Sequence, residues 1–190
     1  VTRRGIGSLL CLRWGEARHV VIGVDTAEWG RDRQAVVMLD ASSGDQVAQV
    51  HGRGLASDVA RGVAWALTEM GIAVPREDGT YRADPSRYTL VVETNRGRNV
   101  AAELQRAGLQ LWAEHGKRPG FITSGANRDH LIGAISAVVE GPSVDADGEP
   151  REPGPLVRLR SSALIRELLG LQADPASGRV AAGLGYHDDL

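Results

Sequence analysis

The sequence predicts an α/β protein whose mixed sheet carries helices on its faces. Two apolar runs, Val20–Val24 and Leu90–Val92, are each followed by a carboxylate, and the first run is typical of a strand buried on both faces. Short, turn-rich connections follow the first run and predict antiparallel neighbours. Later apolar residues recur at helical spacing, which favours helices packed on the sheet. A chain of 190 residues suits one such domain with a sizeable core.

The first half of the chain is expected to form an antiparallel meander, then a helix, a fourth strand and a second helix. Gly71 and Gly108 follow the two helical patterns, as glycine commonly does at a helix C-terminus. The expected elements are strands at 19–25, 34–40 and 46–53, a helix at 57–70, a loop at 75–87, a strand at 88–93 and a helix at 97–107.

The second half continues the alternation of strands and helices. We expect a strand at 109–112, a helix at 127–140, a mobile surface loop at 142–155, a strand at 156–159, a helix at 162–171 and a strand at 180–182. The strand–helix–strand crossovers should be right-handed. If the strand at 88–93 lies beside the strand at 19–25, then Asp25 and Glu93 end at the same edge of the sheet.

Composition excludes some classes of protein. The net charge of −2 argues against a strongly basic nucleic-acid-binding module. Of the 22 cationic residues only Lys117 is lysine, and arginine suits phosphate contacts, although a GC-rich genome would produce the same bias. No window approaches eighteen consecutive apolar residues, so no membrane span is expected. Cys11 is the only cysteine, which rules out an internal disulfide and fits a reducing cytoplasm.

Four carboxylates are the candidate functional residues: Asp25, Glu93, Asp188 and Asp189. A carboxylate at the tip of an apolar strand is costly to bury unless something pairs with it. Acids from distant parts of a chain, with no matching lysine or arginine, indicate a divalent metal site. The alternative is that such acids are turn formers or helix caps.

Three segments of the chain carry these acids. The first is Gly23-Val24-Asp25-Thr26-Ala27, with Gly30 and Asp32 after it. The second is Val91-Val92-Glu93-Thr94-Asn95-Arg96-Gly97, and the last is His187-Asp188-Asp189-Leu190. In their residues, their order and the meander between the first two, these segments resemble the nuclease motifs of tailed-phage large terminase subunits, which belong to the ribonuclease H-like nucleases. The resemblance covers the chain from about residue 19 to its end.

The resemblance implies a ribonuclease H-like fold and a metal-dependent endonuclease that cleaves concatemeric double-stranded DNA with two Mg²⁺ or Mn²⁺ ions. Asp25 would bridge both ions and Glu93 would bind one of them. Asp188 or Asp189 would complete the second position, with Asp188 the favoured direct ligand. Asp32 is a further candidate ligand, although it serves equally well as a turn residue before the next strand.

Five residues are candidate DNA contacts. Asn95, Arg96 and Arg98 follow Glu93 at a strand–helix junction, where backbone amides favour phosphate. Arg158 and Arg160 alternate on one face of an expected strand, where both could reach the DNA backbone.

Large terminases combine a P-loop ATPase with this nuclease, but the sequence has no Gly-x-x-x-x-Gly-Lys-[Ser/Thr] segment. We therefore expect residues 1–18 to be a tail or linker from an absent upstream ATPase domain. Residues 19–190 would be the nuclease domain, truncated at its C-terminal helix. The implied partners are double-stranded DNA, the ATPase domain of the same polypeptide, the small terminase subunit and the portal protein, in the cytoplasm of the host cell.

Two other interpretations remain open. A ribonuclease H-like Holliday-junction resolvase or transposase-type nuclease would keep the fold, but such enzymes more often carry a strongly basic patch. A non-catalytic interaction domain would keep the acids as structural caps. A titration with Mn²⁺ separates the last interpretation from the others, because a degenerate site would bind the ion poorly.

Overall fold

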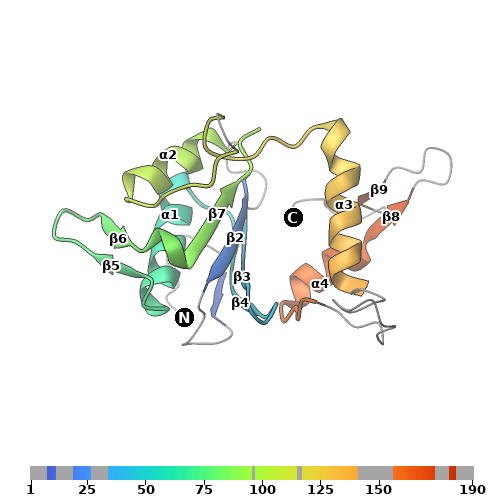
Figure 1. Ribbon diagram of the computed structural model, residues 1–190, viewed down its shortest axis with the longest axis horizontal. Coiled ribbons are helices and arrows are strands. Elements are labelled where there is room, and N and C mark those ends of the chain that lie inside the picture. Colours follow the sequence, from blue (N-terminus) through green and yellow to red (C-terminus); the bar gives the residue numbers. More distant parts are fainter. Residues whose placement is uncertain are drawn as a thin grey trace.

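The computed structural model describes residues 8–11, 19–26, 34–95, 97–114, 117–140, 156–173 and 180–182 (Figure 1). They form a mixed α/β fold in which helices lie on both sides of a central sheet. Helices α1 and α2 stand on one side, and α3 and α4 stand on the other (Figure 1). The predicted fold class is therefore confirmed at this level.

The central sheet has five strands in the order β1-β4-β3-β2-β7. Their bounds are β1 Ser8–Cys11, β2 Val20–Asp25, β3 Gln34–Asp40, β4 Gln46–Gly52 and β7 Tyr88–Val92. Strands β2, β3 and β4 form the predicted antiparallel meander. Strand β7 pairs with β2 in parallel, so the two strands end at the same edge. This adjacency places the residues after both strands close together.

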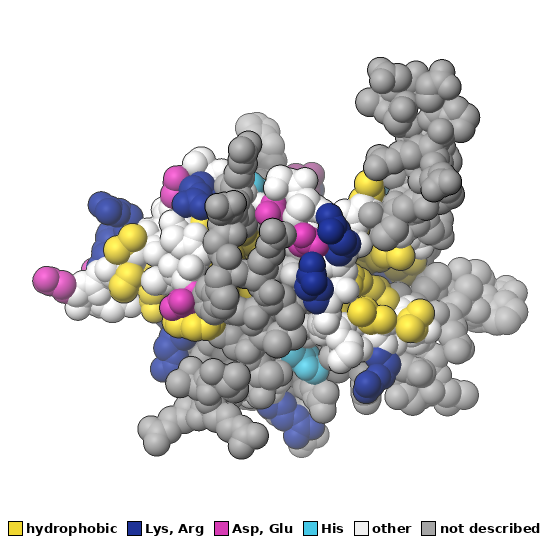
Figure 2. All heavy atoms as spheres, turned by 90° about the horizontal axis from the view of Figure 1, so that it is seen from below, with side chains coloured by type: hydrophobic (Ala, Val, Ile, Leu, Met, Phe, Trp, Pro, Cys, Tyr) yellow, Lys and Arg dark blue, Asp and Glu magenta, His cyan; other side chains and the backbone are white. Residues whose placement is uncertain are grey.

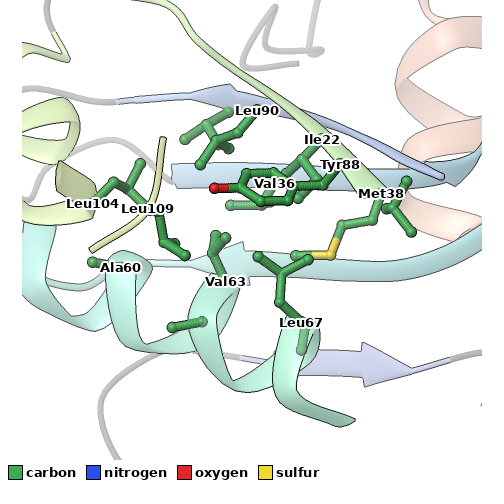
Figure 3. Close-up of a cluster of buried hydrophobic side chains, with 14 of the residues drawn as sticks. Ile22, Val36, Met38, Ala60, Val63, Leu67, Tyr88, Leu90, Leu104 and Leu109 are labelled. Carbon is green, nitrogen blue, oxygen red and sulfur yellow. The ribbon is translucent and has the colours of Figure 1, made fainter. Parts of the chain in front are cut away.

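The core lies between the sheet and helices α1, Ala56–Glu69, and α2, Arg98–Arg106. Val59, Val63 and Leu67 recur at helical spacing on α1, and each is fully buried. Figure 3 shows Val63 and Leu67 pointing toward side chains of β2, β3 and β7. Burial of aliphatic side chains contributes about 1.5–3 kcal/mol each, so this layer is the main source of stability.

Strand β2 is buried on one face only, which corrects the prediction of burial on both faces. Val20, Ile22 and Val24 face the core, whereas Val21 is 38% exposed. Gly23, between them, is exposed as well. Successive side chains of a strand point to opposite faces, so the odd-numbered positions of β2 lie on the α3 and α4 side of the sheet.

The strand arrangement differs from the prediction in four places. Ser8–Cys11, within the expected tail, pairs with β4 as an edge strand. The expected loop at 75–87 holds most of a hairpin, β5 Ala73–Pro75 and β6 Tyr81–Ala83, and the 3₁₀ turn η1 Pro85–Arg87. The expected strands at 109–112 and 156–159 are not regular strands. In the segment 109–112, the backbone N–H of Trp112 donates to Leu90 O at 2.8 Å. In the segment 156–159, Arg158 forms an isolated parallel β-bridge with Asp45.

The remaining described elements follow the sheet in the chain. They are α3 Gly125–Glu140, α4 Ser162–Leu169, and a small hairpin of β8 Leu171–Ala173 and β9 Val180–Ala182. The helices predicted at 127–140 and 162–171 and the strand predicted at 180–182 are confirmed, and β8 was not predicted. The expected loop at 142–155 lies outside the described residues. None of the helices in the described ranges is long and apolar enough to cross a membrane.

Candidate metal centre at the edge of the sheet

The pairing of β2 with β7 brings Asp25 and Glu93 to the same edge of the sheet. Val24 lies beside Val92 in the parallel register, and Asp25 and Glu93 are the next residues of their chains. The backbone N–H of Glu93 donates to Val24 O at 2.9 Å, which continues the ladder to this point. Both acids are partly buried. The predicted adjacency of these two carboxylates is therefore seen in the backbone.

Strand alternation places the two acids on the same face. Val24 and Val92 are buried in the core, so the residues that follow them point away from it. Asp25 shares the face of Val21 and Gly23, and Glu93 shares the face of Val91. This is the side of the sheet on which α3 and α4 stand (Figure 1). Both acids therefore lie on the face of the sheet opposite the apolar core.

A strap of chain, Gly120–Ser124, holds the end of β7. Phe121 pairs with Glu93 in a parallel bridge, and its N–H donates to Val92 O at 2.8 Å. Thr94 donates to Phe121 O through its backbone N–H, at 2.7 Å, and through its hydroxyl, at 3.1 Å. Gly120 has φ of +105°, and a Cβ there would lie 2.3 Å from the Thr94 methyl carbon. The strap therefore fits closely against the residues on either side of Glu93.

The amide of Asn95 links this strap to the acid. Its Nδ2 donates to Thr123 O at 2.6 Å and to Glu93 Oε1 at 3.3 Å. Asn127 closes the end of the strap, because its Oδ1 accepts from Ser124 N and its Nδ2 donates to Ile122 O. No local sequence pattern marks the strap as part of the site, because its contact with Asn95 joins residues 28 positions apart in the chain.

The N-terminus of α2 also lies against this edge. Gly97 is its N-cap, and a Cβ at Gly97 would lie 2.2 Å from Glu93 O and 2.2 Å from Thr26 Oγ1. Thr26 follows Asp25 and is 6% exposed. Its hydroxyl has no hydrogen-bond partner among the described residues. Sequence reasoning missed both Thr26 and Gly97 as parts of the site, although both stand in the motifs that carry the acids.

The predicted DNA-contact residues are divided between the two ends of the sheet. Arg98 is exposed in the first turn of α2, next to the edge of the sheet that carries Asp25 and Glu93, here called the acid edge. Arg158 and Arg160 lie at the opposite end, where their guanidinium groups are 3.4 and 3.6 Å from Oδ1 of the buried Asp45. Because β2 spans the sheet between the two ends, they are separated by roughly 20 Å at about 3.3 Å per residue. Figure 2 views the molecule from this second end, where basic and acidic side chains lie side by side.

The other predicted site residues fall outside the described part of the chain. These are Asp32, Arg96, Asp188 and Asp189. Among the described residues, no three side chains of histidine, cysteine, aspartate or glutamate gather into a group that could hold a metal ion. The two carboxylates that are described offer hard oxygen donors on one face, which is the donor type that Mg²⁺ and Mn²⁺ prefer. Asp25 and Glu93 thus fit as two ligands of such a site.

The fold places the chain among the mixed α/β nuclease folds. It matches the crystal structure of the large terminase nuclease from thermophilic phage G20c with a TM-score of 0.61 and 19% identity. It also matches the structure of that nuclease with bound magnesium, with a TM-score of 0.63 and 20% identity, and the structure with bound cobalt, with a TM-score of 0.61 and 19% identity. Each match covers 99% of this chain and 84% of the other. A scan of protein-family models and a search of curated proteins find no match. The chain therefore has the fold of the large terminase nuclease.

Proposed function

We propose that this chain is the metal-dependent DNA endonuclease domain of a viral packaging terminase. The observation that supports this most is the placement of Asp25 and Glu93 on one face and at one edge of the sheet. The chain shares its fold with a large terminase nuclease that has been crystallised with magnesium and with cobalt. A divalent cation is therefore the expected cofactor, and we propose Mg²⁺ or Mn²⁺.

In the proposed site, each acid has a separate role. Asp25, at the end of a central strand, would bridge two cations, and Glu93 would bind one of them. Asp188 or Asp189 would complete the second position, with Asp32 as a further ligand. Two bound cations would activate a water and neutralise the charge that develops on the phosphodiester. Because both acids lie away from the core and are only partly buried, the DNA backbone would approach them from this face.

The substrate in this proposal is double-stranded concatemeric DNA. Arg96 and Arg98 would contact phosphates beside the acid edge, where the N-terminus of α2 adds its backbone N–H groups. Arg158 and Arg160 would contact the same duplex farther along, because roughly 20 Å corresponds to about six base pairs at 3.4 Å each. The ATPase domain, the small terminase subunit and the portal protein are the proposed partners, in the host cytoplasm.

The test is cleavage of plasmid DNA by purified protein with Mg²⁺ or Mn²⁺. We expect Asp25→Asn to abolish cleavage and to leave the melting temperature unchanged or raised, because one carboxylate fewer relieves repulsion in the metal-free site. Asp78→Asn is the matched control, since Asp78 lies in the exposed β5–β6 turn. Cleavage by Asp25→Asn at the wild-type rate would contradict the proposal. A wild-type protein that neither cleaves DNA nor binds Mn²⁺ would favour the non-catalytic interpretation.

A further inference from the structure

Asn95 stands between the proposed ligand Glu93 and the strap Gly120–Ser124. Its amide nitrogen carries two hydrogens, and the two acceptors within reach are Thr123 O at 2.6 Å and Glu93 Oε1 at 3.3 Å. The side chain is exposed, so these hydrogen bonds rather than burial determine its position. The shorter bond anchors the amide to the strap, and the longer one reaches the carboxylate.

The strap itself is fixed on β7 independently of Asn95. Phe121 is hydrogen-bonded to Val92 and to Thr94, on either side of Glu93. Thr123 follows two residues later, so its carbonyl is held at a set position relative to the end of β7. An amide anchored on that carbonyl restricts the rotation of the Glu93 side chain. It uses one lone pair of Oε1, and a carboxylate has about four, which leaves the others for a cation.

We infer that Asn95 is a positioning residue, which orients the carboxylate of Glu93 for metal binding through the Gly120–Ser124 strap. The inference rests on the proposed function, because it assigns Glu93 to a metal. It replaces the role of DNA contact that the sequence predicts for Asn95. Groups that hydrogen-bond to metal ligands commonly change metal affinity by about 10–100-fold when they are removed.

A titration with Mn²⁺ in the absence of DNA distinguishes the positioning role of Asn95 from the DNA-contact role. We expect Asn95→Ala to weaken Mn²⁺ binding by about 10–100-fold in isothermal titration calorimetry. Asn95→Leu keeps a similar shape without the amide and should lose the same affinity. Asn99→Ala, the same substitution at an exposed position of α2 four residues along, should bind Mn²⁺ like the wild type. All three variants should keep the wild-type melting temperature, because both side chains are exposed.

Cleavage and DNA binding complete the experiment. Cleavage by Asn95→Ala should return toward the wild-type rate as Mn²⁺ is raised, and its affinity for a short duplex in saturating Ca²⁺ should be unchanged. Wild-type Mn²⁺ affinity combined with weaker DNA binding would overturn the inference and restore the DNA-contact role. Wild-type Mn²⁺ affinity in Asn95→Ala, while Glu93→Gln abolishes binding, would overturn the inference alone. Failure of the wild type to bind Mn²⁺ or to cleave DNA would overturn both the inference and the proposed function.

Discussion

At the scale of single residues, the acid edge depends on Gly97, a position with no space for a side chain. Gly97 begins α2 directly against the chain that carries Asp25 and Glu93. Its φ of −94° is open to any residue, so the requirement comes from space and not from backbone conformation. Thr26 fills the volume that a side chain at 97 would occupy. The close approach keeps the N-terminus of α2 at the proposed site.

Gly97→Ala should therefore destabilise the protein and disturb the site. The added Cβ would lie 2.2 Å from the backbone oxygen of Glu93, so the helix must shift. Overpacking of this kind costs about 1–3 kcal/mol of unfolding free energy. Gly133→Ala is the matched control, because a Cβ there meets nothing within 4 Å and the position lies inside α3. The Gly133→Ala substitution should raise the unfolding free energy by about 0.5–1 kcal/mol. Urea denaturation measures both values, and equal stability of the two variants would contradict the packing argument.

At the scale of elements, a buried glutamine joins α4 to the sheet. Gln46 is fully buried at the start of β4, and its Oε1 accepts from the backbone N–H groups of Arg160 and Ser161 at 2.8 and 2.9 Å. Ser161 in turn accepts from Leu164 N through its hydroxyl, in the first turn of α4. Gly44, with φ of +68°, lies so near Leu156 O that a Cβ would have no room. These contacts attach the segment before α4 to the β3–β4 hairpin.

Gln46→Leu should release this attachment. The change leaves two backbone N–H groups without their acceptor, and each unsatisfied buried group costs about 1–3 kcal/mol. We expect the unfolding free energy to fall by about 2–6 kcal/mol, and hydrogen exchange to speed up in α4 before it does so in α1. Gln105→Leu, at an exposed position of α2, should change stability by less than about 0.5 kcal/mol. Exchange in α4 at the wild-type rate would show that Gln46 does not hold the helix.

At the scale of the whole molecule, charge limits how this domain meets DNA. The net charge is −2, and the proposed site adds acids at the place where the DNA backbone would lie. The arginines at the far end of the sheet share one buried carboxylate, so Asp45 cancels part of their charge. These two arginines therefore offer less net positive charge to phosphates than their number suggests. Tight binding would then depend on the proposed partners holding the DNA in place.

The isolated domain should bind duplex DNA weakly, with little sequence preference and a shallow dependence on salt. The slope of log affinity against log salt is about −0.9 for each neutralised phosphate, so three or four contacts give a slope near −3. Fluorescence anisotropy of a short duplex, with Ca²⁺ in place of Mn²⁺, measures both quantities. Nanomolar affinity for one sequence would contradict this expectation and favour the resolvase-type alternative.

The sequence by itself determined the main strands, the helices and the pair of acids at the sheet edge. Strands β2, β3, β4 and β7 and helices α1, α2, α3 and α4 follow from local patterns, because apolar runs between turn residues indicate strands and apolar residues at helical spacing indicate helices. Asp25 and Glu93 could be placed together because each directly follows an apolar strand. A parallel neighbour was then enough to bring the two carboxylates to one edge.

Only the tertiary structure decided which groups surround that pair. Asn95 meets Thr123 across 28 residues of chain, and Arg160 meets Gln46 across 114. The pairing of Ser8–Cys11 with β4 and the exposure of Val21 likewise depend on elements remote in sequence. Local patterns record which side of an element is apolar, but they do not record which distant segment covers it. That choice is made by packing and hydrogen bonding in the assembled fold, where the buried polar groups of every segment must find partners together.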